Sequence, residues 1–246
     1  LAFNKKFYVP NNAVLVVAGD IEIASTKKMV QDYFGDIPRG SDIERNYQKD
    51  DPITEAISAT AYDSNIQIPA VINAYRTPGF SERDSRVLDM ISTYLSDGPS
   101  SKLYKKLVDE KKMALQTGAF NISQEDYSMY VIFGLPLGDN TLDDLVSEMD
   151  EEIVKIQDQL ISERDYQKLQ NKIENGFVNS NASIEGIANS LARYYMLYDD
   201  TNLVNTEIDI YRSIKREEIK DVANKYLNPN QCLVLEYLPE TKENEL

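Results

Sequence analysis

The residues that most often carry out acid–base or metal chemistry are scarce in this chain of 246 residues. It contains no histidine, so it lacks both the commonest metal ligand and the commonest general base. Among the neighbouring acids, the pairs Asp143-Asp144, Glu151-Glu152 and Asp199-Asp200 are expected on exposed faces rather than as a catalytic pair of carboxylates. The sequence therefore predicts no catalytic residue and no metal ligand.

Two other groups could act as nucleophiles, and neither has the surroundings that such chemistry requires. The single cysteine, Cys232, lies in an apolar run and is predicted to be a small buried hydrophobe. The Gly-x-Ser-Ser stretch that starts at Gly98 lacks the strand–turn–helix context of a nucleophile elbow and has no histidine partner. The Gly19-Asp20 turn has neither the glycine-rich repeat nor the lysine of a phosphate-binding loop.

The charge of the chain limits its partners. The formal net charge is −15, from 41 acids and 26 bases, so we expect no binding to nucleic acid or to anionic membranes. Hydrophobic residues make up 42% of the chain, which is enough for a core. No signal sequence or membrane-spanning segment is recognisable, and the cellular compartment is not indicated. Because the chain starts at Leu1-Ala2-Phe3 without an initiator methionine, we expect a fragment of a longer parent.

The clearest structural signal lies in residues 7–38, FYVPNNAVLVVAGDIEIASTKKMVQDYFGDIP. Residues 13–18 are a continuous apolar run of strand-forming residues between the turn signals Pro-Asn-Asn and Gly-Asp. A strand with no polar face is expected inside a sheet with both of its faces covered. Apolar residues at helical spacing follow, and Gly35 and Pro38 predict the end of that helix. We therefore expect this strand at the centre of the domain.

The remaining sequence predicts five more strands, grouped as two, two and one, with helices between them. The first pair is expected to form a meander beside the run at 13–18, with its two strands as neighbours, and the second pair is expected to form a hairpin. A short helix after residue 102 should turn Leu103, Tyr104 and Leu107 inward and its lysines outward. The strands are predicted at 53–62, 69–75, 114–122, 128–135 and 231–237, and the other helices at 81–95, 140–160, 162–177, 184–197, 208–211 and 213–226.

This order of elements predicts the α+β class. The expected architecture is a two-layer α/β sandwich, in which helices back a mixed, mostly antiparallel sheet of about six strands. The sequence contains no linker rich in Pro, Gly or Ser that would divide it. We therefore expect a single domain over residues 1–246, with a frayed tail at 239–246.

Three blocks in order resemble the pitrilysin/insulinase family of zinc metallopeptidases, which includes mitochondrial processing peptidase. Residues 7–38 are similar to the opening of the family's second, non-zinc-binding domain. Residues 95–114, LSDGPSSKLYKKLVDEKKMA, resemble a helix end, a Gly-x-Ser-Ser break and the next helix start, with Lys102 where arginine is usual. Residues 161–169, ISERDYQKL, are similar to the acidic start of a later helix.

The resemblance implies a metallopeptidase half whose metal lies elsewhere. In the family, two histidines of an H-x-x-E-H helix and a downstream glutamate bind zinc in the domain that precedes this one. No cofactor is therefore expected in this chain, and zinc is expected in the neighbouring domain of the parent. The substrate-holding arginine and tyrosine of the partner half would fall at Val108 and Leu115, which cannot replace them. The substrate-binding residues are therefore unknown.

The resemblance also implies a function. We expect a non-catalytic domain of a zinc metalloendopeptidase, which forms part of the substrate chamber and packs on the zinc-binding domain. Its expected partners are that domain, the second half of the peptidase and peptide substrates, with basic peptides favoured if the acidic surface faces inward. Two alternatives stay open: an inactive paralogue that serves as a structural or assembly subunit, and a module that binds peptides at a free sheet edge.

Overall fold

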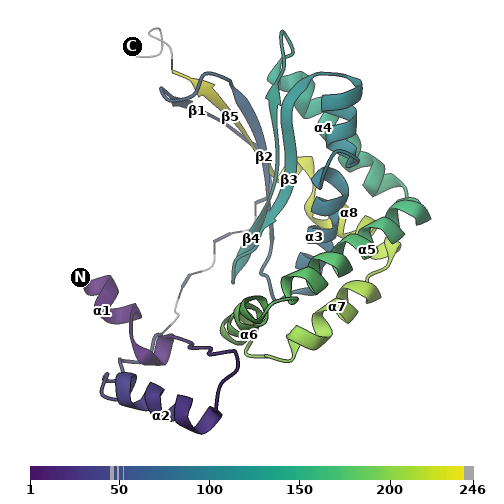
Figure 1. Cartoon of the computed structure of the whole chain (residues 1–246). Coiled ribbons are helices and arrows are strands. Elements are labelled where there is room, and N and C mark those ends of the chain that lie inside the picture. The colour runs from purple at the N-terminus through teal and green to yellow at the C-terminus, as the bar shows by residue number, and fades with distance from the viewer. Residues whose placement is uncertain (45–46, 49, 52, 241–246) are drawn as a thin grey trace. The chain divides into compact units, whose positions relative to one another are not determined.

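The computed structural model describes residues 1–44, 47–48, 50–51 and 53–240, and it divides into two compact units (Figure 1). Unit 1 consists of Leu1–Asp51 and Glu174–Ile208, and unit 2 contains the rest of the chain. The sheet and most of the buried core belong to unit 2. Of the tail predicted at 239–246, Pro239 is the last residue of a strand, and residues 241–246 lie outside the described residues.

Unit 2 contains a mixed sheet of five strands in the order β1-β5-β2-β4-β3. The strands are β1 (Ile57–Asp63), β2 (Ala70–Pro78), β3 (Ala114–Ile122), β4 (Tyr127–Pro136) and β5 (Cys232–Pro239). β1 and β5 are parallel, and all other pairs are antiparallel. The predicted fold class and the β3–β4 hairpin are confirmed. The expectation that β1 and β2 are neighbours is wrong, because β5 from the end of the chain lies between them.

The helices that pack on this sheet lie on one side of it (Figure 1). α3 (Arg83–Ser96) contacts β3 and β2, α4 (Leu142–Asp158) contacts β4 and β2, and α8 (Arg216–Tyr226) contacts β2, α3 and α4. α5 (Glu163–Ser180) and α7 (Leu203–Ser213) each begin in one unit and end in the other. Unit 1 contains α1 (Ala2–Phe7), α2 (Ile23–Phe34) and α6 (Ile184–Tyr198).

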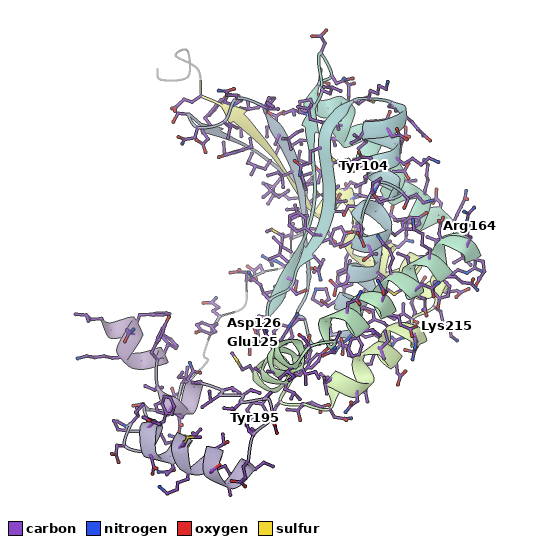
Figure 2. The ribbon with its side chains drawn as sticks, in the orientation of Figure 1. Tyr104, Glu125, Asp126, Arg164, Tyr195 and Lys215 are labelled. Carbon is purple, nitrogen blue, oxygen red and sulfur yellow. The ribbon has the colours of Figure 1, made fainter. Side chains whose placement is uncertain are left out.

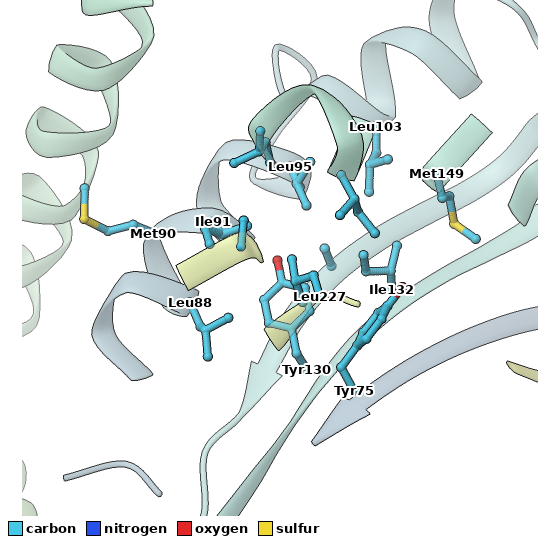
Figure 3. Close-up of a cluster of buried hydrophobic side chains, with 14 of the residues drawn as sticks. Tyr75, Leu88, Met90, Ile91, Leu95, Leu103, Tyr130, Ile132, Met149 and Leu227 are labelled. Carbon is cyan, nitrogen blue, oxygen red and sulfur yellow. The ribbon is translucent and has the colours of Figure 1, made fainter. Parts of the chain in front are cut away.

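The core lies between the sheet and these helices (Figure 3). Tyr75 and Tyr130 from the strands belong to one buried cluster with Leu88, Ile91 and Leu95 of α3, and each of these side chains is at most 1% exposed. The stripe predicted for α4 is confirmed from Leu145 through Ile156, whereas Leu160 follows the end of the helix and is 40% exposed. Cys232 is buried as predicted, and its burial raises the pKa of the thiol to about 11.

The apolar run at residues 13–18 forms neither a strand nor a helix, so the prediction of a buried central strand is wrong. Leu15 and Val17 are 59% and 46% exposed. In the part of the chain that the structure describes, no strand pairs with the run, and an unpaired strand cannot satisfy its backbone hydrogen bonds. The sheet of the described residues therefore has five strands rather than about six. The helix predicted after the run is present as α2 and ends before Gly35.

A charged cluster joins the π-helix Tyr104–Glu110 to α4. The Lys106 ammonium lies 2.9 Å from Glu148, 2.8 Å from Glu151 and 3.3 Å from Glu152. The side chains of Lys106 and Glu152 are only 12% and 7% exposed. The predictions of an outward Lys106 and an exposed Glu152 are therefore wrong, because each supplies the opposite charge that lets the other be buried. Tyr104, predicted inward, is 39% exposed (Figure 2).

The pKa shifts in this cluster favour its charged state. A hydrogen bond from Lys111 lowers the pKa of Glu148, against the effect of burial, and Lys106 lowers it further. Burial would lower the pKa of Lys106, but hydrogen bonds to Glu151 and Glu148 outweigh it and raise that pKa. Because the folded pKa of Glu148 lies below its unfolded value, its stabilising contribution is present above the unfolded value and is lost as the pH falls through the folded pKa.

Replacing Lys106 by methionine leaves three clustered carboxylates without their shared cation. We expect Lys106→Met to lower the free energy of unfolding at pH 7 by about 2–3 kcal/mol, because one partner of a largely buried group is removed. The control is Lys105→Met, because Lys105 lies 3.5 Å from Glu110 in a pair that is 60% and 57% exposed. For this exposed pair we expect a loss below about 1 kcal/mol in urea unfolding. Equal losses for the two variants would contradict this interpretation of the cluster.

Candidate functional site: the open face of the sheet

The side of the sheet opposite α3, α4 and α8 is apolar, and the strand pairing defines its members. Successive side chains of a strand point to opposite faces, so the neighbours of the core residues Tyr75 and Tyr130 point away from the helices. Paired residues share a face, and the register extends this assignment across all five strands. We call the resulting surface the open face.

The open face contains three rows of side chains that cross the sheet from strand to strand, and the same register adds Ala61, Tyr237 and Ala70, with Asp63 beyond them, at one border. The rows are Ala59–Leu235–Ile72–Phe133–Gly118, Ile57–Leu233–Ala74–Val131–Phe120, and Arg76–Met129–Ile122. Arg76 is the one ionisable residue among them. Neither candidate catalytic groups nor metal ligands lie in these rows.

The open face is most exposed at its borders and closely packed at its centre. Ile57, Phe120 and Met129 are 47%, 43% and 42% exposed, although all three are large and apolar. At the centre, Ala74 and Val131 are buried, yet both lie outside the core that the helices cover. Phe120, Ile122 and Met129 are neighbours in the register, and a contiguous exposed apolar patch of this kind marks sites where proteins bind a partner or a ligand.

A glycine allows two aromatic rings to meet on this face. A Cβ atom at Gly118 would lie 2.5 Å from Cε1 of Phe133, so the absence of a side chain gives the ring its place over β3. The Phe133 ring meets that of Phe120 edge to face, with 6.1 Å between the centroids and 63° between the planes. The two rings form the most aromatic part of the open face.

Polar contacts lie at two borders of the face. The Arg76 guanidinium lies 5.1 Å from the centroid of the Tyr127 ring, which is a cation–π distance. At the other end of the sheet, the Tyr237 hydroxyl donates a hydrogen bond to Asp63, which lowers the pKa of Asp63 and raises that of Tyr237. β1 and β3 form the two edges of the sheet, and the backbone groups of an edge strand can accept a further strand.

Two of the three acidic pairs considered from the sequence lie at helix ends rather than in a site, and the third, Glu151-Glu152, belongs to the Lys106 cluster. The Thr141 hydroxyl accepts from the Asp144 backbone N–H at 3.1 Å, and the Asp144 carboxylate accepts from the Thr141 N–H at 2.9 Å. The hydroxyl and the backbone N–H of Thr141 lower the pKa of Asp144. Asp199 ends α6 in the left-handed conformation, and Asp200 accepts from the Asn202 N–H at 2.8 Å.

The positions aligned with the family's substrate-holding residues are also separate from the open face. Val108 packs against the core as a partly buried side chain. Leu115 is 47% exposed and lies at an irregularity in the β3–β4 register, where it has no paired residue. The open face was not among the features predicted from the sequence. Its signal was present in β4 and β5, where consecutive apolar residues indicate strands that are apolar on both faces.

A comparison with protein families identifies the group to which this chain belongs. Residues 1–173 match the family described as "Peptidase M16 inactive domain". The chain is a member of the M16 peptidase family. The resemblance to zinc metallopeptidases, and to their non-catalytic domain in particular, is therefore confirmed.

Two Helicobacter pylori proteins similar to this M16 domain are longer than it. "Zinc protease PqqE" of Helicobacter pylori (strain ATCC 700392 / 26695) is 24% identical over 231 residues, which are 93% of this chain and 52% of the relative. The M16 domain described here thus spans about half the length of that curated relative. The crystal structure of a protease from Helicobacter pylori has a TM-score of 0.89 and 22% identity, over 96% of this chain and 57% of that chain.

A second solved structure is shorter than this chain. It is the inactive peptidase domain of a protein from Bordetella parapertussis, with a TM-score of 0.64 and 21% identity. The likeness covers 72% of this chain and 95% of that chain. Both solved structures show the fold of this M16 domain.

The residues of this M16 domain do not fit the zinc ion that the family implies. Catalytic zinc sites in proteins use histidine with carboxylate or cysteine ligands, and the chain has no histidine. Among the described residues, no three His, Cys, Asp or Glu side chains are placed to hold a metal ion. The described residues therefore do not supply a set of ligands for a zinc ion. None of the described helices has the length and apolar character needed to cross a membrane.

The two faces of β4 should respond differently to truncation. We expect Ile132→Ala, on the helix side and 0% exposed, to lower the free energy of unfolding by about 3 kcal/mol through a core cavity. We expect Met129→Ala, on the open face and 42% exposed, to cost less than about 1 kcal/mol in the same urea titration. A loss at Met129 as large as that at Ile132 would show that the open face is covered within the chain.

Proposed function

We propose that this chain is the non-catalytic domain of an M16 zinc metalloendopeptidase and that its open face forms part of the substrate chamber wall. The proposal rests on the open face, which is apolar and lies opposite the helices. It belongs to a domain whose family is described as inactive. The zinc-binding domain and the second half of the peptidase would be its partners, and the peptide bond would be cut there. This chain would bind and orient substrate.

The composition of the open face indicates which peptide side chains it would bind. Its three rows contain aromatic and aliphatic side chains together with Arg76, and Asp63, the carboxylate that the register places on the same face, lies beyond them at the border. Burying an apolar side chain against such a surface contributes roughly 25 cal/mol per Å² of apolar area removed from water. The open face would therefore favour apolar side chains, whereas the net charge of −15 would act at longer range by attracting basic peptides.

Charged substitutions on the open face of the full-length parent protein test this function. We expect Phe120→Glu combined with Met129→Glu to raise KM for an apolar peptide about 10-fold, because each carboxylate would have to lose water on binding. The rate constant kcat and the zinc content should stay unchanged. The readouts are initial-rate kinetics and metal analysis of the same preparation.

The matched control places the same two charges on exposed apolar residues of the helical layer. Val154 and Leu160 are 48% and 40% exposed, close to the values at Phe120 and Met129. Val154→Glu combined with Leu160→Glu should leave KM unchanged. Equal KM for both double variants would overturn the chamber-wall role. A full-length parent that binds no zinc and cleaves no peptide would instead favour a structural subunit.

A further inference from the structure

A short hydrogen-bonded network of polar side chains lies on the helix side of the sheet, where β2 and β5 pair. Tyr75 and Cys232 are paired residues of these strands, and both are buried. The Tyr75 hydroxyl donates a hydrogen bond to the Cys232 thiol and accepts one from the side-chain amide of Asn73. The thiol donates in turn to the Leu233 carbonyl at 3.4 Å. We call Asn73, Tyr75 and Cys232 the Tyr75 network.

The Tyr75 network lacks a donor at its Asn73 end. Asn73 is 1% exposed, and its amide nitrogen is used in the bond to Tyr75. Its carbonyl oxygen, Oδ1, is buried and has no hydrogen-bond partner among the described residues. Leaving a buried acceptor unpaired is unfavourable, and the low dielectric of a core increases the cost. One further donor, placed beside Asn73, would complete the network.

Asp150 of α4 is a second group near this network without a partner. Its negative charge raises the pKa of both the Tyr75 hydroxyl and the Cys232 thiol, so it lies within electrostatic range of them. The Asp150 carboxylate forms no hydrogen bond and no ion pair with any described residue. Its side chain is half-buried, and this burial raises its pKa. An unpaired carboxylate and an unpaired carbonyl oxygen therefore lie near the same tyrosine.

The geometry of α4 turns Asp150 toward the network. Met149 points into the core, and Glu148 and Glu152 lie on the flank that meets Lys106 of the π-helix. At about 100° per residue, Asp150 lies on the opposite flank. The π-helix contacts β3, an outer strand, whereas α4 contacts β4 and β2. The flank that carries Asp150 therefore faces β2 and β5, where the network lies.

We propose that Asp150 is a proton-operated switch between α4 and the sheet. When the carboxyl group is protonated, its O–H donates a hydrogen bond to Asn73 Oδ1, which completes the Tyr75 network and binds the middle of α4 to β2. When the proton leaves to solvent, this bond is lost and both oxygen acceptors are left without a donor. The proton comes from water, so the step needs no other reactant. The switch lies on the covered side of the sheet and does not depend on the role of the open face.

Other ionisable groups also face α4 from the elements packed against it, or lie on the same side of the sheet. They are Lys106 and Lys111 near the π-helix, Tyr130 in β4, Lys220 in α8 and Glu236 in β5. Both lysines near the π-helix bind Glu148 on the far flank, and Lys220 donates to the Asp158 carbonyl at 2.8 Å. Burial accounts for the raised pKa of Asp150, with no contribution from these charges. The unpaired acceptor of Asn73 is therefore the partner available to Asp150.

The switch responds to pH in the opposite direction to the Lys106 cluster. Because the folded pKa of Asp150 lies above its unfolded value, its stabilising bond is fully present below the unfolded value and is lost as the pH rises through the folded pKa. Glu148, on the other flank, has a lowered folded pKa and loses its contribution as the pH falls. Mild acidification therefore strengthens the contact of α4 with β2 while its contact with the π-helix is still intact.

Asp150→Asn tests the switch, because an asparagine amide supplies the missing donor at every pH. In urea unfolding at pH 7, we expect the variant to lower the unfolding equilibrium constant at least about 5-fold relative to the unchanged chain. This difference should shrink steadily as the pH is lowered toward about 4, where protonated Asp150 already donates. A variant no more stable than the unchanged chain at pH 7, or a gain that is the same at every pH, would overturn the proposal.

The matched control is Asp143→Asn in the same helix. Asp143 is exposed in the first turn of α4, where a negative charge is favourable. Removing that charge supplies no donor to the Tyr75 network, so the control should not be more stable than the unchanged chain at any pH. An equal gain in both variants would show that the loss of any negative charge from α4 is sufficient, and would overturn the assignment.

NMR titration separates the hydrogen bond from the effect of burial alone. In the unchanged chain, the side-chain amide signals of Asn73 should shift with pH at the same midpoint as the carboxyl carbon of Asp150. Asn73→Leu removes the acceptor and keeps the site apolar, so Asp150 should titrate at a lower pH in that variant. Asn73 signals that do not follow Asp150, or an unchanged titration of Asp150 in Asn73→Leu, would overturn the proposal.

Discussion

The sheet of this domain is apolar on both faces, but helices cover only one of them. The other features of the domain depend on this constraint. The rows through Phe133 and Val131 are as apolar as the helix-side layer of Tyr75 and Tyr130, yet no core residue from α3, α4 or α8 covers them. Exposing such surface to water is unfavourable, and a sheet of this kind needs a second layer or a ligand. The same holds on a smaller scale for residues 13–18 with α2. The described residues of the domain therefore leave apolar surface uncovered in two places.

The covered side explains how the fold persists although the other side is open. Tightly packed side chains from α3 and α4 fill the space above β2 and β4, and Lys106 joins three carboxylates where the π-helix meets α4. Polar bonds extend this layer: the Asn121 amide donates to Ser85 at 3.1 Å and to Asp89 at 3.2 Å, and so connects β3 to α3. Because the stabilising contacts lie on the helix side, substitutions on the open face can change binding without unfolding the domain.

The sequence predicted those features that depend on local order, and failed where the outcome depends on distant segments. The α4 stripe from Leu145 to Ile156 and the β3–β4 hairpin follow from periodicity alone. The insertion of β5 between β1 and β2 joins residues that are far apart in the chain, and no local pattern encodes it. Lys106 looked like a solvent-facing lysine because its three acidic partners lie about 40 residues away. The run at 13–18 has the composition of a buried strand, and the described chain contains no strand that pairs with it.

The central claim is that this chain provides shape and apolar surface, and that metal chemistry belongs to another domain. Zinc analysis by mass spectrometry tests it most directly, with the purified chain incubated in excess zinc and then dialysed. The account predicts far less than one zinc ion per chain and no peptide cleavage, because the sequence has no histidine and the described residues offer no ligand cluster. One tightly held zinc ion per chain, with cleavage that a chelator abolishes, would contradict it.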